Sequence, residues 1–218
     1  LADALAADII LRCGVVFVRP RGGGMDGRAG FRLRAGNSRG AIQIGDLTLE
    51  SRSGARLAAS GGAAIVYEWP EGAVSFDRDF ALSGGGFPDA RFQLARDRSG
   101  AMRGRARIAP MAAGGARLVL GEIDFAPGPG GRTRFRTNIL ADGPAGVGRV
   151  EGLALPVEGR FGPDGLVIGE SCVAASFHAL RIEGLQLGPT RLPLCPVGPA
   201  IVWQARGGPL RVGAELRE

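Results

Sequence analysis

Residues that bind metals or carry acid–base chemistry are scarce in this chain of 218 residues. It has one histidine and three cysteines, and none of them falls in a C-x-x-C or H-x-x-x-H spacing, so the sequence predicts no metal site and no cofactor. No stretch reaches about 18 consecutive apolar residues, so no membrane-spanning helix is predicted. The opening LADALAADII has two aspartates and no basic start, so we do not expect this segment to be a signal peptide.

Lysine is absent, and all 27 basic residues are arginines against 21 acidic residues, for a net charge of +6. We interpret the missing lysine as the composition of a GC-rich genome and not as a sign of mechanism. The arginines are spread along the chain instead of gathered in one run, so no nucleic-acid partner is predicted. Because the chain starts without Met and stops at GAELRE, we expect one section of a longer protein.

Glycine and proline are abundant, at 38 and 14 residues, while 45% of the chain is hydrophobic. This mixture is typical of many short strands separated by turns. A helical pattern occurs only at the start, where Leu1, Leu5 and Ile9 are four residues apart. There we expect a short amphipathic helix.

From Phe31 onward, apolar residues recur at every second position, which is the period of a strand with one buried face. In AIQIGDLTLE the pattern changes phase at Gly45 and Asp46, where a β-bulge would restore it. In all there are about a dozen such windows, spaced roughly ten residues apart. Between them stand turn sequences such as GGG, PGPGG, DGP and PDG.

Short connections without intervening helices predict a wide antiparallel meander, and a sheet of a dozen strands must curl or split into two layers. We expect an all-β fold that curves into an open apolar groove. The alternative is a β-sandwich or closed barrel whose inner faces fill each other. We treat residues 1–218 as one section of the groove, with a soft break near 126–132. The residues expected to line it are Ile42, Ile44, Leu47, Leu49, Phe76, Phe80, Leu82, Phe92, Leu94, Leu118, Leu120, Phe135 and Ile139.

Three patterns that resemble catalytic motifs lack the context they need. GNSRG matches G-x-S-x-G with Ser38 as nucleophile and His178 downstream, but a strand follows where the motif requires a helix. GGGMDG fits G-x-G-x-x-G and is also followed by a strand. Asp77 and Asp79 share one face of a strand, which is usual for a solvated edge. We therefore predict a protein that is not an enzyme.

Two cysteines bracket residues 172–195, CVAASFHALRIEGLQLGPTRLPLC. Two or three short strands folded back on each other would bring Cys172 and Cys195 together at one end. A disulfide there would restrict the unfolded chain, whereas the alternative is two buried free thiols in a cytosolic protein. Cys13 is left over in either case.

The segment from 149 to 202, which contains EGLQLGPTRLPLCP, resembles the AsmA-like proteins of Gram-negative bacteria, in particular their YdbH-type branch. The residues in matching places are Gly184, Leu185, Leu187, Leu192, Leu194, Cys195 and Pro196.

This resemblance implies a periplasmic groove, anchored at the inner membrane by other parts of the protein, that conducts phospholipid toward the outer membrane. Phospholipids would be its partners, and membrane surfaces would be contacted through parts outside this section. The alternative function is a structural or adhesive β-domain of an exported protein with a self-closed core.

Overall fold

The computed structural model describes residues 25–35 and 38–217. Within them every regular element is a strand except η1 (Pro129–Gly131), a single 3-10 turn, and all the strand pairs are antiparallel. The prediction of an all-β antiparallel protein is therefore confirmed. The helix expected around Leu1 to Ile9 and the residue Cys13 lie outside the described residues. The described part of the chain contains no helix that is long and apolar enough to cross a membrane.

The chain divides into two compact units, unit 1 (Leu1–Gly104) and unit 2 (Arg105–Glu218). The division falls inside strand β6 (Met102–Ile108). The region from 126 to 132, where the sequence suggested a soft break, lies within unit 2. There the backbone N–H of Gly128 donates to the carbonyl of Arg132 at 2.8 Å, which closes the connection between two paired strands.

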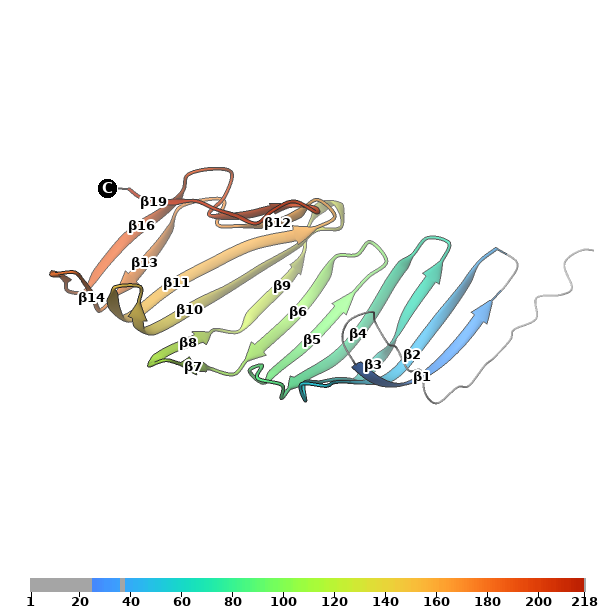
Figure 1. The fold of residues 1–218 in the computed structure, drawn as a ribbon. Coiled ribbons are helices and arrows are strands. Elements are labelled where there is room, and N and C mark those ends of the chain that lie inside the picture. Colours follow the sequence, from blue (N-terminus) through green and yellow to red (C-terminus); the bar gives the residue numbers. More distant parts are fainter. Residues whose placement is uncertain (1–24, 36–37, 218) are drawn as a thin grey trace, which may run out of the picture. The chain divides into compact units, whose positions relative to one another are not determined.

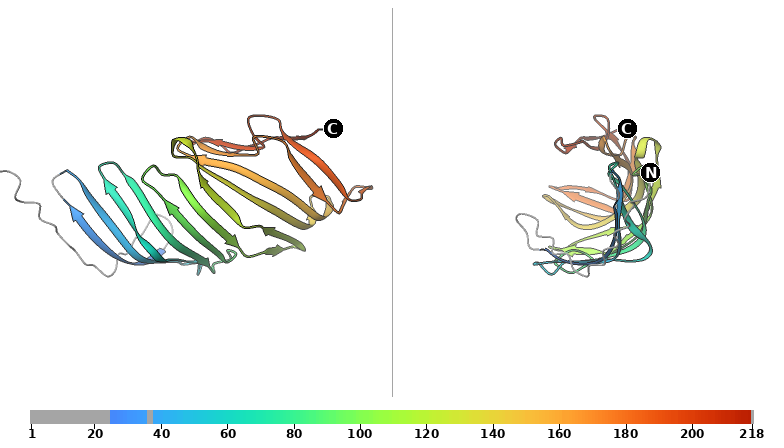
Figure 2. Two further views of the ribbon diagram at one scale, coloured as in Figure 1. Left: turned by 180° about the vertical axis from the view of Figure 1, so that it is seen from behind. Right: turned by 90° about the vertical axis from the view of Figure 1, so that its right-hand side faces the viewer.

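Unit 1 is a meander in which each strand pairs with the next one along the chain (Figure 1). Its strands are β1 (Met25–Ala35), β2 (Gly40–Ser51), β3 (Arg56–Trp69), β4 (Ala73–Ser83) and β5 (Ala90–Arg96). Figure 2 shows the same side-by-side order from behind. Among the described residues no pairing joins β1 to β5, so this sheet stays open.

Bulges interrupt the ladders of unit 1 on two strands. The pairing of β2 with β3 shifts between Ile44 and Leu47, which confirms the bulge predicted at Gly45 and Asp46. On β3 the register with β4 shifts twice, on either side of Ala63. Gly62 has a φ of +58°, and a Cβ there would stand 2.1 Å from the carbonyl oxygen of Asp77, so only glycine fits this close approach.

Unit 2 is built around the long hairpin of β10 (Thr133–Ala145) and β11 (Gly148–Gly162). Strands β8 and β9 pair with β10, and β12, β13 and β14 pair with β11. The remaining strands of unit 2 are β7 (Met111–Ala113), β8 (Ala116–Leu120), β9 (Ile123–Pro127), β12 (Gly165–Ile168), β13 (Val173–Phe177), β14 (Ala179–Ile182), β15 (Leu185–Leu187), β16 (Thr190–Pro196), β17 (Val202–Ala205), β18 (Arg211–Val212) and β19 (Ala214–Leu216).

The turn predicted at DGP is wrong, because this segment lies within β10. Gly143 has a φ of +126° and sits where the β10 and β11 registers shift. A Cβ at this position would stand 2.5 Å from the Cα of Ala116, so the glycine allows a bulge and a close approach of β8. The chain reverses later, at Gly146, where φ is +59°.

Candidate functional site

The strand registers place the nine predicted apolar residues of unit 1 on one face of its sheet. Residues directly opposite each other on paired strands project from the same face. Ile44 faces Ile65, and Leu49 faces Leu57, which faces Leu82. Phe80 in turn faces Phe92. The residues that share this face are Ile42, Ile44, Leu47, Leu49, Phe76, Phe80, Leu82, Phe92 and Leu94.

Unit 2 has a similar face. Ile139 on β10 stands between Leu120 and Leu155, and Phe135 faces Phe125. Leu118 lies two residues before Leu120 on β8 and therefore projects from the same side. All four predicted residues of this unit, Leu118, Leu120, Phe135 and Ile139, thus share a face.

The large side chains of these apolar faces are only partly covered. All thirteen predicted residues are half-buried, and none is fully buried. The buried hydrophobic residues of the described chain are mostly small: Ala59, Ala90, Ala101, Ala106, Phe177, Cys195 and Ala200. A self-closed sandwich would bury its large side chains between two layers, because that is where its core forms. Each unit instead keeps the large side chains of its apolar face partly exposed.

The opposite face is charged and solvated. In unit 2, Glu122 pairs with Arg105 and Arg107, and Asp124 pairs with Arg105 and Arg136. The three arginine side chains are largely exposed and the two carboxylates partly so, and each pair therefore adds little to stability. In unit 1, Asp77 lies 3.8 Å from Arg103, and both side chains are about 70% exposed, at 68% and 71%.

A further exposed cluster on unit 2 joins β11 to the segment that follows β12. The Arg160 guanidinium donates two hydrogen bonds to the Glu170 carboxylate, at 2.8 and 3.0 Å. These bonds hold the pKa of Glu170 below its ordinary value, against a smaller opposing effect of burial. Hydrogen bonds from Arg132 likewise lower the pKa of Asp164. Both carboxylates therefore stay ionised, which keeps this face charged.

Arg78 is an exception on the apolar face of unit 1, and the sequence analysis missed it. It stands between Phe76 and Phe80 at period two, and only 5% of it is exposed. Its Nη2 donates to Asp46 Oδ1 at 2.8 Å, and its Nη1 donates to the carbonyl of Ala63 at 3.3 Å. Nη2 is also 3.5 Å from the carbonyl oxygen of Ala59. Arg78 thus donates to a side-chain carboxylate and to backbone carbonyls close to the bulges of β2 and β3.

We expect Arg78→Ala to lower the free energy of unfolding of unit 1 by about 2–3 kcal/mol, because Asp46 and the carbonyls of Ala59 and Ala63 lose a charged donor. Arg78→Lys should recover only part of this, since an ammonium cannot reproduce the guanidinium fork. The measurement is urea unfolding followed by Trp69 fluorescence in a Trp203→Phe background. Arg91→Ala is the control: Arg91 is exposed on the other face of β5, and its loss should change the free energy by less than about 0.5 kcal/mol. Equal losses in both variants would contradict this role of Arg78.

Comparisons with protein-family models, with curated proteins and with solved structures found no match for this chain. A function must therefore be argued from the apolar faces and the residues around them.

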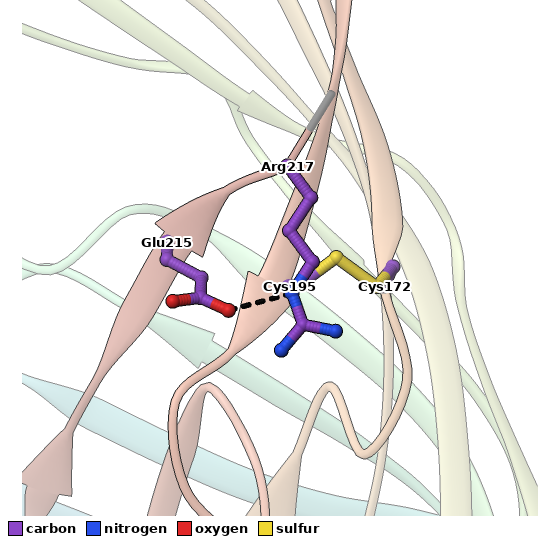
Figure 3. Close-up of a disulfide and its surroundings, with 4 residues drawn as sticks. All are labelled: Cys172, Cys195, Glu215 and Arg217. Atoms are coloured by element: carbon purple, nitrogen blue, oxygen red, sulfur yellow. Dashed lines mark hydrogen bonds and ion pairs between the residues drawn. A yellow bond between two sulfur atoms is a disulfide. The ribbon is translucent and has the colours of Figure 1, made fainter.

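The disulfide between Cys172 and Cys195 is present in unit 2, with the two Cα atoms 4.0 Å apart (Figure 3). Cys172 directly precedes β13, and Cys195 lies near the end of β16, where Val173 faces Leu194. Cys195 is buried and also stands opposite Glu215 on β19. The fold-back of short strands expected from the sequence therefore brings the two cysteines together.

Ser38 and His178, the residues of the rejected hydrolase motif, have ordinary surroundings. Ser38 is exposed, and strand β2 follows it in place of the helix that a nucleophile elbow needs. His178 is exposed at the junction of β13 and β14, and its ring lies over Gly152, where an added Cβ would stand 2.3 Å from Nδ1. Its backbone N–H donates to the carbonyl of Glu151 at 2.9 Å.

Proposed function

We propose that the apolar faces bind the acyl chains of phospholipids, and that this chain is one section of a periplasmic conduit between the inner and outer membranes of a Gram-negative bacterium. The observation that carries the proposal is the set of thirteen large apolar side chains that stay partly exposed on one face of each unit's sheet, while the buried hydrophobic residues of the described chain are mostly small. An acyl chain would cover this surface.

Acyl chains suit these faces energetically. Each methylene removed from water contributes about 0.8 kcal/mol, and strand after strand offers aliphatic residues to cover it. The charged opposite face would stay in water. Aromatic residues number 13 among 218, so the surface is mostly aliphatic, which favours sliding over tight recognition of one molecule. Binding and transport of this kind need no catalytic group.

The compartment is proposed on two supports. The Cys172–Cys195 disulfide is typical of proteins that fold in an oxidising compartment. The segment that contains this disulfide carries the resemblance to AsmA-like proteins, whose lipid-conducting grooves lie in the periplasm.

Native mass spectrometry of the protein, purified without detergent from Gram-negative cells, tests the proposal. We expect species whose added mass equals one or more phospholipids, and extraction with organic solvent should release the same lipids for identification. Solvent-treated protein should take phospholipid up again when it is returned to vesicles. A protein that is folded, lipid-free after purification and unable to take lipid up would contradict the proposal and favour a structural or adhesive β-domain.

A further inference from the structure

The apolar face of unit 1 changes character along its strands. At one end, Leu57 faces Leu82, which faces Ala90, and no polar side chain intervenes. At the other end, Tyr67 faces Val74, and Phe76 faces Arg96.

Trp69, two residues beyond Tyr67, projects from the same side and packs against Gly40 and the Tyr67 ring. The chain's only tyrosine and one of its two tryptophans therefore share this end of the face with an arginine. We call Tyr67, Trp69 and Arg96 the polar end. Tyrosine, tryptophan and arginine are the side chains that join an apolar surface to water, because each has an apolar body and a polar tip.

Arg96 has no counter-charge among the described residues. Its Nε is buried without a hydrogen-bond partner, and within the described ranges 25–35 and 38–217 no ion pair or hydrogen bond involves its guanidinium. The nearest carboxylate in sequence, Asp97, is bound to the hydroxyl and backbone N–H of Ser99. Gly100, in the turn after β5, keeps space beside the guanidinium, since a Cβ there would stand 3.3 Å from Nη2.

The other arginine of this face, Arg78, has partners for both terminal nitrogens of its guanidinium, although its Nε, like that of Arg96, has none among the described residues. Arg78 is buried whereas Arg96 as a whole is partly exposed, and the Arg78 guanidinium has Asp46 and the carbonyl of Ala63 as partners. Arg98 and Arg103, close to Arg96 in sequence, each pair with a carboxylate. Arg96 therefore stands out as a cation on an apolar face that lacks its anion.

We propose that Arg96 binds the oxyanion of an amphiphile, a phosphate or carboxylate carried by a lipid head group, at the polar end of unit 1. This inference rests on the proposed function and adds the charge of the head group and its position. A guanidinium on an apolar surface favours an oxyanion, because desolvation strengthens the charge-assisted hydrogen bonds between them. The acyl chain then runs from Phe76 past Phe80 and Phe92 toward Leu82.

Native mass spectrometry of lipid competition tests this site. Solvent-treated protein is offered equimolar phosphatidylglycerol and diacylglycerol with the same acyl chains, and the bound ratio is measured. We expect the wild-type protein to prefer the anionic lipid by about tenfold or more, and Arg96→Gln to reduce that preference by about tenfold, the effect of losing a charge-assisted hydrogen bond. Arg91→Gln removes the same charge from the other face of β5 and should leave the preference unchanged.

The outcomes separate the two proposals. If both lipids bind equally to the wild-type protein, or if Arg91→Gln loses as much preference as Arg96→Gln, the head-group site is wrong while lipid binding stands. If neither lipid binds, the proposed function fails and the head-group site fails with it. In a third arm, inorganic phosphate is added alone; Arg96-dependent binding of phosphate that lipid does not displace would assign the site to a free oxyanion and overturn the amphiphile.

Discussion

Phe80→Asp is expected to remove most of the bound phospholipid while the sheet of unit 1 remains folded. Phe80 lies between Ala59 and Phe92 on the apolar face, and its ring meets that of Phe76 edge to face at 5.5 Å. Loss of the ring removes about 1.5–3 kcal/mol of apolar contact, and a carboxylate at this place must be desolvated when an acyl chain covers it. The amount of lipid per protein in native mass spectra should fall by about tenfold or more.

Ala81→Asp is the matched control for this variant. Ala81 is the next residue on β4, is exposed, and projects from the opposite face. The Ala81→Asp substitution introduces the same charge into the same strand but does not contact the acyl chain, so lipid occupancy should stay at the wild-type level. Far-UV circular dichroism checks that both variants keep their strands. A folded Phe80→Asp protein with wild-type lipid content, or an equal loss in both variants, would show that the apolar face of unit 1 is not where lipid binds.

Loss of the disulfide is expected to lower the free energy of unfolding of unit 2 by about 3.4 kcal/mol. The bond joins residues 23 apart in sequence, and closing a loop of that length restricts the unfolded chain by about this amount in the chain-entropy model. In the double variant Cys172→Ala/Cys195→Ala the ends of β13 and β16 are held only by their ladder. Urea unfolding, followed by Trp203 fluorescence in a Trp69→Phe background, measures the change in unit 2.

Reduction provides the control for the disulfide. In a Cys13→Ser background, dithiothreitol should destabilise the parent protein to the level of the double variant and have no effect on the double variant itself. Cys13 is replaced so that no third thiol can exchange with the bond. If the parent protein unfolds at the same urea concentration with and without dithiothreitol, the bond contributes nothing to the stability of unit 2.

Much of unit 1 could be predicted from the sequence because its strands pair in chain order. Period two assigns Phe80 and Phe92 to a face without knowledge of the partner strand, since side chains alternate along any strand. The bulge at Gly45 and Asp46 was also visible, because apolar residues on both sides change phase there. Neighbouring hairpins then align these faces, since register follows the same alternation.

Other features depend on close contacts between strands that no local sequence pattern predicts. DGP has the composition of a turn, yet β8 runs close to Gly143 and makes it a bulge inside β10. The apolar pattern of ARLVLGEIDFA, residues 116–126, shows no turn sequence, yet the segment forms β8 and β9 with a break at Gly121, whose N–H donates to the carbonyl of Asn138 on β10. The strands from β17 to β19 are very short and were not predicted.

By itself, the sequence determined the strand class, the composition of the two faces and which cysteines could pair, because alternation and turn chemistry are local properties. Only the tertiary structure decided that the apolar side chains stay half-buried and that Arg78 and Arg96, both at apolar-face positions, differ in their partners. The groups that cover a side chain or supply its counter-charge come from strands distant in sequence; for Arg78 the counter-charge is the Asp46 carboxylate on β2. The period-two pattern of a single strand does not identify such partners.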